Sequence, residues 1–251
     1  MLKRTVKKLL KLIFKPTVIP VSLPGLDEFK LTAEKTQQRF LFLKEDYYPC
    51  LDDNTSNTNF DRHYIYHPAW AARVVKNINP QFHIDISSTL HFATILSAFI
   101  PVKFYDYRPA KIELENLTSQ KENLMSLGFA SDSIYSLSCM HTVEHIGLGR
   151  YGDKIDYDGD LKAVAELSRV LAKGGSLLFV TPVGAKARIQ FNAHRIYTKE
   201  LVVSMFAIYG LKLKEFSLIP ENEDDGGCIN DPSTELLSRQ KYACGCFWFT
   251  K

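Results

Sequence analysis

The chain has 251 residues, of which 45% are hydrophobic and 24% charged, the composition of a globular protein with enough apolar material for a sizeable core. The formal net charge is only +3, although residues 1–15 carry six lysines and arginines and no acid. The remainder is therefore slightly acidic and lacks the positive field with which proteins bind nucleic acids. No uncharged apolar stretch reaches the roughly 18 residues that a membrane-spanning helix needs.

Residues 1–20 form a basic N-terminal segment that begins with the pattern of an amphipathic helix. Its apolar residues fall on one helical face and its lysines and arginine on the other. Such a helix can pack on its own domain or form a frayed arm. It can also lie on an anionic membrane surface, so we expect peripheral membrane contact through residues 1–15 as the alternative.

The cysteine pattern bears on the compartment of the protein and on metal binding. The count is five, which is odd, and no two cysteines form a C-x-x-C pair; they are Cys50, Cys139, Cys228, Cys244 and Cys246. This pattern predicts reduced thiols in a cytoplasmic protein, and we expect no metal site built from them.

Residues 21–75 predict an N-terminal extension of helix and loop. The polar run DDNTSNTNF at residues 52–60 indicates a loop, and PAWAARVV predicts a helix with Pro68 in its first turn. Four aromatic side chains of this region either line a pocket or cover the core from one side: Tyr64, Tyr66, His67 and Trp70.

Strand and helix patterns alternate from residue 76 to 251. Apolar runs predict strands at residues 82–86, 102–106, 111–117, 134–139 and 176–182, with two late strands in 211–219 and 242–251. Helical spacing marks residues 89–99, 160–173 and 198–210. The alternation predicts an α/β, Rossmann-like, doubly wound and mostly parallel seven-stranded sheet with an antiparallel edge strand. This arrangement resembles the class I S-adenosylmethionine-dependent methyltransferase fold.

The segment HTVEHIGLGRYG at residues 141–152 contains two overlapping motifs. Its H-x-x-E-H pattern is that of a zinc protease, which requires a regular helix, whereas Gly147 and Gly149 end any helix here within two turns. Its G-x-G-x-x-G pattern would bind a dinucleotide only directly after the first strand. We therefore interpret Gly147, Gly149 and Gly152 as a loop with positive φ angles and close backbone approach.

Ligands of doubly wound sheets bind outside the carboxyl ends of the strands, and three groups of residues fall there. Asp85, Ser87 and Ser88 follow the first strand, Asp106 and Tyr107 end the second, and residues 141–145 follow the strand at 134–139. A carboxylate at the position of Asp106 can accept hydrogen bonds from both hydroxyls of a ribose, or it can cap the strand end.

The blocks SLSCMHTVEHIGLGRYGD, DYDGDLKAVAELSRVLAKGGSLLFVTPVG and FNAHRIY, with HPAWAARVV upstream and DDGGCINDP and YACGCFWFTK downstream, resemble a bacterial family, domain of unknown function 268. The resemblance covers about residues 60–251. It implies a methyltransferase fold, S-adenosylmethionine as cofactor and an association with surface-polysaccharide genes. It assigns the cofactor to Asp85, Ser87, Ser88, Asp106, Tyr107 and His141. Ser87 stands where the resemblance leads us to expect glycine, and its Cβ disfavours positive φ and weakens cofactor binding.

Methyl transfer needs a group that removes a proton from the acceptor. We expect His145 or His141 to be this base and Glu144 to orient a histidine, or instead to pair with Arg150. His194 is the alternative base, or ties a loop, and Arg195 could hold an anionic group. A bound divalent ion could replace the base, although no metal ligand is assigned.

The sequence thus predicts O-methylation of a sugar or surface-polysaccharide intermediate by a cytoplasmic protein, peripheral to the inner membrane. The alternative is a non-catalytic scaffold of the same fold in polysaccharide assembly, and a nicotinamide-dependent oxidoreductase is a third hypothesis. The acceptor, a small molecule or a glycan, and the oligomeric state are not specified by these patterns.

Overall fold

The computed structural model describes residues 23–36 and 39–251, which belong to two compact units, Met1–Asn59 and Phe60–Lys251. In the first unit, α2 (Leu26–Glu34) and the 3₁₀ helix η1 (Lys44–Asp46) are the regular elements of the described part. The amphipathic helix predicted for residues 1–15 lies outside the described residues, so its contact with a membrane stays a prediction. No helix of the described ranges is long and apolar enough to cross a membrane.

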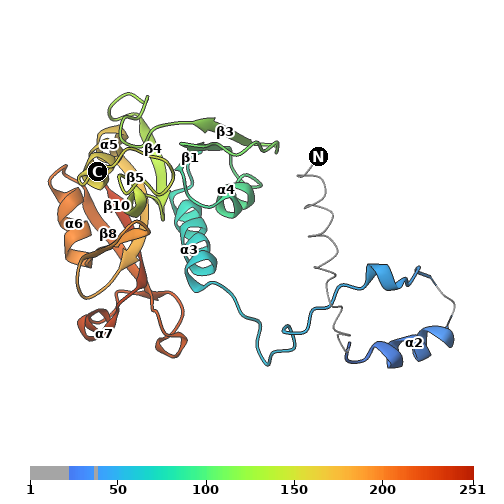
Figure 1. Ribbon diagram of the computed structural model, residues 1–251. Helices are drawn as coiled ribbons and strands as arrows, with labels where there is room; N and C mark the ends of the chain where they lie inside the picture. The colour runs from blue at the N-terminus through green and yellow to red at the C-terminus, as the bar shows by residue number, and fades with distance from the viewer. Residues whose placement is uncertain (1–22, 37–38) are drawn as a thin grey trace, which may run out of the picture. The chain divides into compact units, whose positions relative to one another are not determined.

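The second unit is built on an eight-stranded sheet with the order β3-β2-β1-β4-β5-β10-β8-β9 (Figure 1). The strands are β1 (His83–Ile86), β2 (Val102–Asp106), β3 (Leu117–Lys121), β4 (Ile134–Met140), β5 (Leu171–Val183), β8 (Lys212–Ile219), β9 (Ile229–Asn230) and β10 (Ala243–Thr250). The first five pair in parallel, whereas β10 runs antiparallel between β5 and β8. The predicted Rossmann-like, mostly parallel sheet is confirmed, with the antiparallel strand inside it and the two-residue β9 added at the edge.

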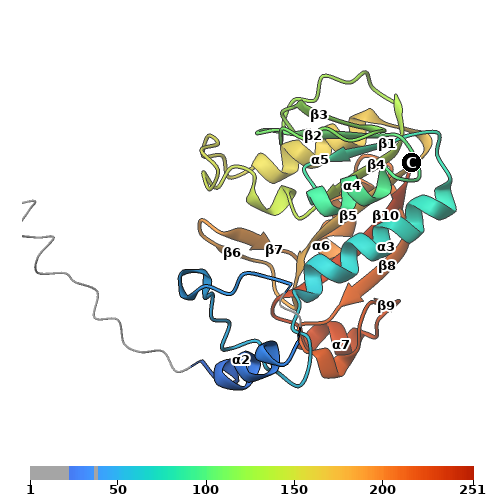
Figure 2. The same ribbon diagram turned by 90° about the vertical axis from the view of Figure 1, so that its right-hand side faces the viewer.

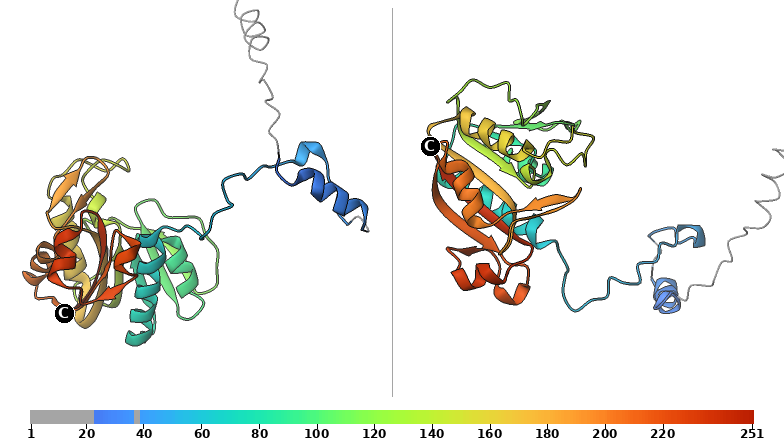
Figure 3. Two further views of the ribbon diagram at one scale, coloured as in Figure 1. Left: turned by 90° about the horizontal axis from the view of Figure 1, so that it is seen from below. Right: turned by 60° about the vertical axis from the view of Figure 1, so that its left-hand side comes forward.

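Helices cover both faces of this sheet (Figure 2; seen from below in Figure 3). On one face lie α3 (Arg62–Ile78) and α4 (Leu90–Leu96), whose apolar residues form one core cluster with the sheet. On the other lie α5 (Gly159–Val170) and α6 (Lys199–Ala207), which contribute to a second cluster. Four smaller elements complete the unit: η2 (Val143–His145), the hairpin of β6 (Arg188–Gln190) and β7 (His194–Ile196), η3 (Glu223–Asp225) and α7 (Thr234–Arg239).

Helix α3 begins six residues earlier than the sequence predicted. Asp61 caps it, since its carboxylate accepts a hydrogen bond from the backbone N–H of Tyr64 at 3.2 Å. The predicted start at Pro68 was wrong, because this proline lies inside the helix, where it removes a single backbone donor. Residues 62–67 are therefore helical and belong to the sheet unit, and the boundary expected at residue 75 falls inside α3.

Six of the predicted strands overlap β1, β2, β4, β5, β8 and β10. Strand β5 begins at Leu171, so the helix predicted for residues 160–173 ends three residues early, at Val170. The strand predicted at residues 111–117 was wrong, since β3 begins at Leu117 and continues to Lys121. Leu117 is the one buried residue of this strand, so its sequence carries almost no apolar pattern. That is physically reasonable because β3 pairs with β2 on one side and has no strand on the other.

Candidate functional site

A cavity of about 370 Å³ lies at the carboxyl ends of β1 to β4, where the topology places ligands in this type of sheet. This volume falls within the usual range for small-molecule sites. Four of the predicted cofactor residues line it: Ser87, Asp106, Tyr107 and His141. Its other lining residues are Arg108, Glu122, Asn123, Leu124, Met125, Thr142, His145, Ile146, Tyr151, Asp153 and Lys154. We call it the cofactor cavity.

Asp106 ends β2 and has one of the two roles that the sequence left open, that of a strand-end cap, while ribose binding stays a prediction. Its Oδ1 accepts a hydrogen bond from the backbone N–H of Arg108 at 2.6 Å, so the carboxylate caps the strand end. It also lines the cofactor cavity, and a carboxylate with one such bond retains lone pairs for further donors. The cap therefore fixes the carboxylate without exhausting its capacity to bind hydroxyl groups.

Ser87 holds the turn after β1 in a left-handed conformation, with φ of 57°. Its backbone N–H donates to the carbonyl of Tyr105 at 2.7 Å, and its own carbonyl accepts from the hydroxyl of Thr142 at 2.8 Å. Serine therefore keeps the backbone that glycine adopts freely, at a cost of about 1–2 kcal/mol from its Cβ.

Asp85 lies fully buried beneath this turn and does not line the cofactor cavity. Its Oδ1 accepts from the hydroxyl of Ser138, whose oxygen is also 2.8 Å from Nε2 of His83. Burial raises the pKa of Asp85 to about 7 and lowers the pKa of His83 to about 3. This buried chain links β1 to β4. Ser88 supports the same junction, since its hydroxyl accepts from the backbone N–H of Met140 at 3.1 Å.

The segment after β4 places His141 and Glu144 side by side in the interior. His141 Nδ1 is 2.9 Å from Glu144 Oε1, and the Glu144 residue is 0% exposed. Arg150 instead donates to the carbonyl of Ala193 at 3.0 Å. Within the described ranges, Glu144 has only the histidines at 141 and 145 as ion-pair partners.

His145 presents a ring nitrogen that can accept a proton. Its Nδ1 is 2.6 Å from the carbonyl oxygen of Ala193, and because a carbonyl only accepts, Nδ1 carries the hydrogen. The lone pair of the neutral ring is then on Nε2, which is 3.9 Å from Glu144 Oε1. This geometry is that of a general base oriented by a backbone carbonyl.

A second cavity, of about 260 Å³, adjoins this segment, and we call it the acceptor cavity. It is lined by Tyr64, His141, Glu144, His145, Arg150, Tyr151, Ala193, His194 and Tyr242. It shares His141, His145 and Tyr151 with the cofactor cavity. The two cavities therefore meet at the HTVEH segment.

His194 and Arg195 lie on β7 but have different surroundings. His194 lines the acceptor cavity, and its Nε2 is 2.6 Å from Gln190 Oε1 across the hairpin. Burial, and then the neighbouring His145, lower the pKa of His194. Arg195 is buried and donates to the carbonyls of Ile146 and Tyr157, so it lines neither cavity and serves to hold the loop.

The glycine loop has the positive φ angles that were predicted, and the expected close backbone approach is found at Gly147. Gly147, Gly149 and Gly152 have φ angles of 79°, 72° and 82°. A Cβ on Gly147 would lie 2.0 Å from the carbonyl oxygen of Asp156, which no side chain could tolerate. The carboxylate of Asp153 accepts from the backbone N–H of Gly147 at 2.8 Å and so organises the loop beside the cofactor cavity.

Sequence reasoning missed two groups of lining residues. Residues 122–125 line the cofactor cavity directly after β3, and they were missed because the third strand was predicted too early. Tyr242 lines the acceptor cavity from the start of the last strand, and nothing in the local sequence indicates this. Of the aromatic residues near α3, Tyr64 lines this cavity, whereas His67 and Trp70 are buried.

Comparison with known families corrects one expectation. The family model described as "Caenorhabditis protein of unknown function, DUF268" matches residues 102–224. The prediction of a bacterial family was therefore wrong, and the match is shorter than the predicted range of 60–251. No curated protein sequence matches the chain.

Several solved structures with a similar architecture are described as methyltransferases. An S-adenosylmethionine-dependent methyltransferase from Leishmania major superposes with a TM-score of 0.50 at 8% identity, covering 73% of this chain and 71% of that chain. A candidate sarcosine dimethylglycine methyltransferase from Galdieria sulphuraria gives 0.50 at 14% identity, covering 72% and 84%. At these identities the likeness establishes the fold alone, which is the class I methyltransferase-like α/β fold.

Replacing Asp85 by asparagine should remove a pH dependence of stability. The folded-state pKa of about 7 exceeds the usual value of about 3.9 in an unfolded chain. The stability from this carboxyl is therefore complete below about pH 4 and is lost as the pH rises through 7, at about 1.4 kcal/mol per pH unit. Urea unfolding at several pH values should show this slope in the wild type and not in Asp85→Asn. An Asp224→Asn control, at an exposed position, should keep the slope; parallel profiles for wild type and Asp85→Asn would contradict the assignment.

Replacing Ser87 tests the strain at the turn after β1. Ser87→Gly should raise the free energy of unfolding by about 1 kcal/mol, because it removes the Cβ that a left-handed residue tolerates poorly. Ser87→Val should lower it, since a β-branched side chain is worse at positive φ. Urea denaturation measures both. A valine variant as stable as the wild type would mean that the turn is not left-handed in solution.

Proposed function

We propose that the chain is an S-adenosylmethionine-dependent methyltransferase that methylates a hydroxyl group of a small polar acceptor. The observation that carries this proposal is the junction of two cavities at His145, whose imidazole lines both, with a strand-end carboxylate in one of them. The methyltransferase-like fold supports it, since in such sheets ligands bind at this edge.

The residues of the cofactor cavity fit an adenosine cofactor. The carboxylate of Asp106 keeps lone pairs for a ribose diol, and the left-handed turn at Ser87 lines the same cavity. The side chains of Leu124 and Met125 add apolar surface of the kind on which a purine ring packs. We assign the ribose to Asp106 and the methionine part to the Ser87 turn.

The acceptor cavity supplies the groups that the transfer requires of the protein. S-adenosylmethionine provides a methyl group on a positively charged sulfur, and its transfer to a hydroxyl leaves a neutral thioether and releases the hydroxyl proton. In our proposal Nε2 of His145 accepts this proton, because Nδ1 is held by the carbonyl of Ala193. Tyr64, Tyr151 and Tyr242 surround the acceptor and limit water near the base.

The chemistry of the acceptor cavity favours a small hydroxyl-bearing molecule such as a sugar. Aromatic rings can pack on the apolar faces of a sugar ring, while Arg150, His194 and tyrosine hydroxyls can bind its oxygens. The expectation of a surface polysaccharide rested on the bacterial family, which the comparisons overturn. The sugar class is therefore proposed from the lining residues.

Removing the Asp106 carboxylate should weaken cofactor binding. Asp106→Ala should raise the dissociation constant for S-adenosylmethionine at least about tenfold, since a hydrogen bond to a charged group contributes about 1.5–3 kcal/mol. Isothermal titration of the purified chain measures it, with exposed Asp224→Ala as the matched control. Wild-type affinity in Asp106→Ala would exclude the ribose assignment, and no binding by the wild type would favour the non-catalytic scaffold.

Removing the proposed base should slow the chemistry without changing cofactor binding. His145→Ala should lower kcat about 100-fold or more, the usual contribution of a positioned base, while the S-adenosylmethionine affinity stays within about twofold. The assay follows S-adenosylhomocysteine release over a panel of sugars and nucleotide sugars. A larger loss in His194→Ala than in His145→Ala would transfer the role to His194.

A further inference from the structure

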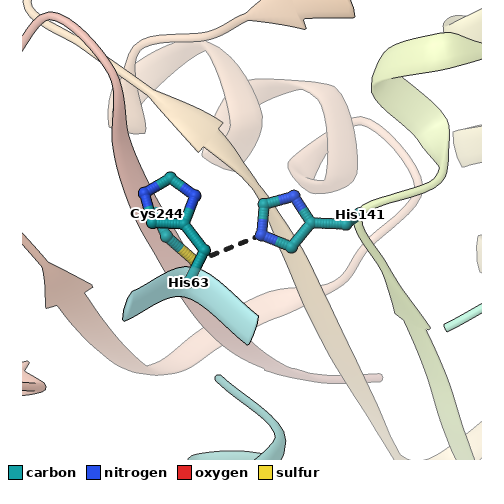
Figure 4. A group of neighbouring side chains, drawn as sticks. All are labelled: His63, His141 and Cys244. Atoms are coloured by element: carbon teal, nitrogen blue, oxygen red, sulfur yellow. Dashed lines mark hydrogen bonds between the residues drawn. The ribbon is translucent and has the colours of Figure 1, made fainter. Parts of the chain in front are cut away.

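Three side chains with metal-binding atoms converge beside the acceptor cavity, which one of them, His141, lines. Figure 4 shows the three side chains. His63 comes from α3, His141 follows β4, and Cys244 belongs to β10. One ligand atom of each, two imidazole nitrogens and a sulfur, lie within 4.8 Å of one another. The Sγ of Cys244 is 3.4 Å from Nε2 of His141, the contact drawn as a dashed line.

The orientation of His141 points its lone pair at this cluster. Its Nδ1 contacts Glu144 Oε1 at 2.9 Å, and because a carboxylate accepts only, Nδ1 carries the hydrogen. Nε2 of the neutral ring then carries the lone pair that can bind a metal, and it lies next to Cys244. A carboxylate that holds the outer nitrogen of a metal-binding histidine is the usual arrangement around protein-bound zinc.

The surroundings of the cluster lack the positive charge that a buried carboxylate requires. Glu144 Oε2 is buried without a hydrogen-bond partner, and within residues 23–36 and 39–251 no lysine or arginine nitrogen lies within 4.0 Å of its carboxylate. His67, one turn along α3, is 0% exposed with an unpartnered Nε2, and its ring centroid is 4.9 Å from that of His141. Buried polar atoms without partners cost about 1–3 kcal/mol each, which a bound cation would offset.

We propose that His63, His141 and Cys244 bind a zinc ion, with Glu144 orienting His141. Two imidazoles and a thiolate are soft to intermediate ligands, which select zinc over magnesium or calcium. No spacing motif indicates this site, since its ligands are 78 and 103 residues apart along the chain.

The separations agree with a tetrahedral zinc site that is nearly formed. Zinc bonds of about 2.1 Å to nitrogen and 2.3 Å to sulfur place these two atoms about 3.6 Å apart, close to the observed 3.4 Å. His63 is only half-buried, so its side chain can rotate to close the remaining distance. Its neighbour Tyr242, with a ring centroid 5.2 Å away, lines the acceptor cavity.

Three protein ligands leave one position of a tetrahedral ion open, as in catalytic zinc sites. His141 also lines the acceptor cavity, so an ion at this site would lie beside the space proposed for the acceptor. Zinc there would bind the acceptor oxygen and lower the pKa of its hydroxyl. This role rests on the proposed function, whereas the metal site itself does not.

The test is a metal titration of the full chain after removal of metal by a chelator under reducing conditions. Cobalt(II) serves as the optical probe, because a tetrahedral site gives strong visible bands and a cysteine ligand adds a thiolate-to-cobalt charge-transfer band. We expect one cobalt per chain, displaced by one equivalent of zinc. Cys244→Ala should abolish the charge-transfer band and weaken binding at least about tenfold, and His63→Gln should weaken binding to a similar extent.

Two matched variants distinguish loss of a ligand from general damage. Cys246→Ala removes an equally buried thiol of β10 outside the cluster, and His91→Gln removes an exposed helical histidine. Both should bind cobalt as the wild type does. The proposal is overturned if the wild type binds no stoichiometric cobalt or zinc at micromolar concentration, or if Cys244→Ala and His63→Gln bind as tightly as the wild type; the 3.4 Å contact is then a thiol–imidazole hydrogen bond alone.

Titration with S-adenosylmethionine, in metal-free and zinc-loaded protein, separates the two proposals. Stoichiometric zinc that depends on Cys244, without cofactor binding, supports the metal site and overturns the methyl-transfer role. Cofactor binding without any metal binding overturns the metal site and leaves the proposed function intact.

Discussion

The antiparallel insertion of β10 between β5 and β8 is the constraint on which the site depends. Because β10 runs against β5, its amino end lies at the carboxyl end of β5, with Ala243 opposite Val183 and Cys244 opposite Pro182. On the other side of β5, Met140 pairs with Val180. His141 and Cys244 therefore approach each other across a single strand, β5. If the last strand ran parallel to β5, Cys244 would lie at the opposite end of the strands.

The burial of Glu144 follows from this arrangement and determines the electrostatics around it. The residue is fully buried in η2, between the sheet and the loop that carries Ala193, and its partners in the described part of the chain are imidazoles rather than fixed cations. A buried carboxylate is stabilised by neighbouring groups that are protonated or that bind a cation. The two neighbouring histidines supply this charge in the two proposals: His145 when its Nε2 accepts the hydroxyl proton, and His141 when it binds a cation.

Sequence reasoning located the sheet well and the site only in part, and the difference has a physical origin. Strand β2 has three buried apolar residues, Val102, Phe104 and Tyr105, so it was predicted at its observed bounds with Asp106 at its end. The edge strand β3 has a single buried residue, so the prediction misplaced this strand and missed the lining residues that follow it. The start of α3 was missed because Pro68 resembles a first-turn proline, which hid the helical placement of His63 and His67. Cys244 joins the site through strand register, which no local pattern encodes.

Two residues at the cavities have strained backbone conformations. Ser87 and His141 both adopt left-handed conformations, with φ of 57° and 55°, although neither is glycine. Such residues cost about 1–3 kcal/mol each and persist when the surrounding contacts hold them. Here the hydroxyl of Thr142, the residue after His141, donates to the carbonyl of Ser87, so each strained turn holds the other. A hydrogen bond therefore joins the turn proposed to hold the cofactor to the segment proposed to bind the acceptor and zinc. A change in the backbone of one turn is expected to shift the other.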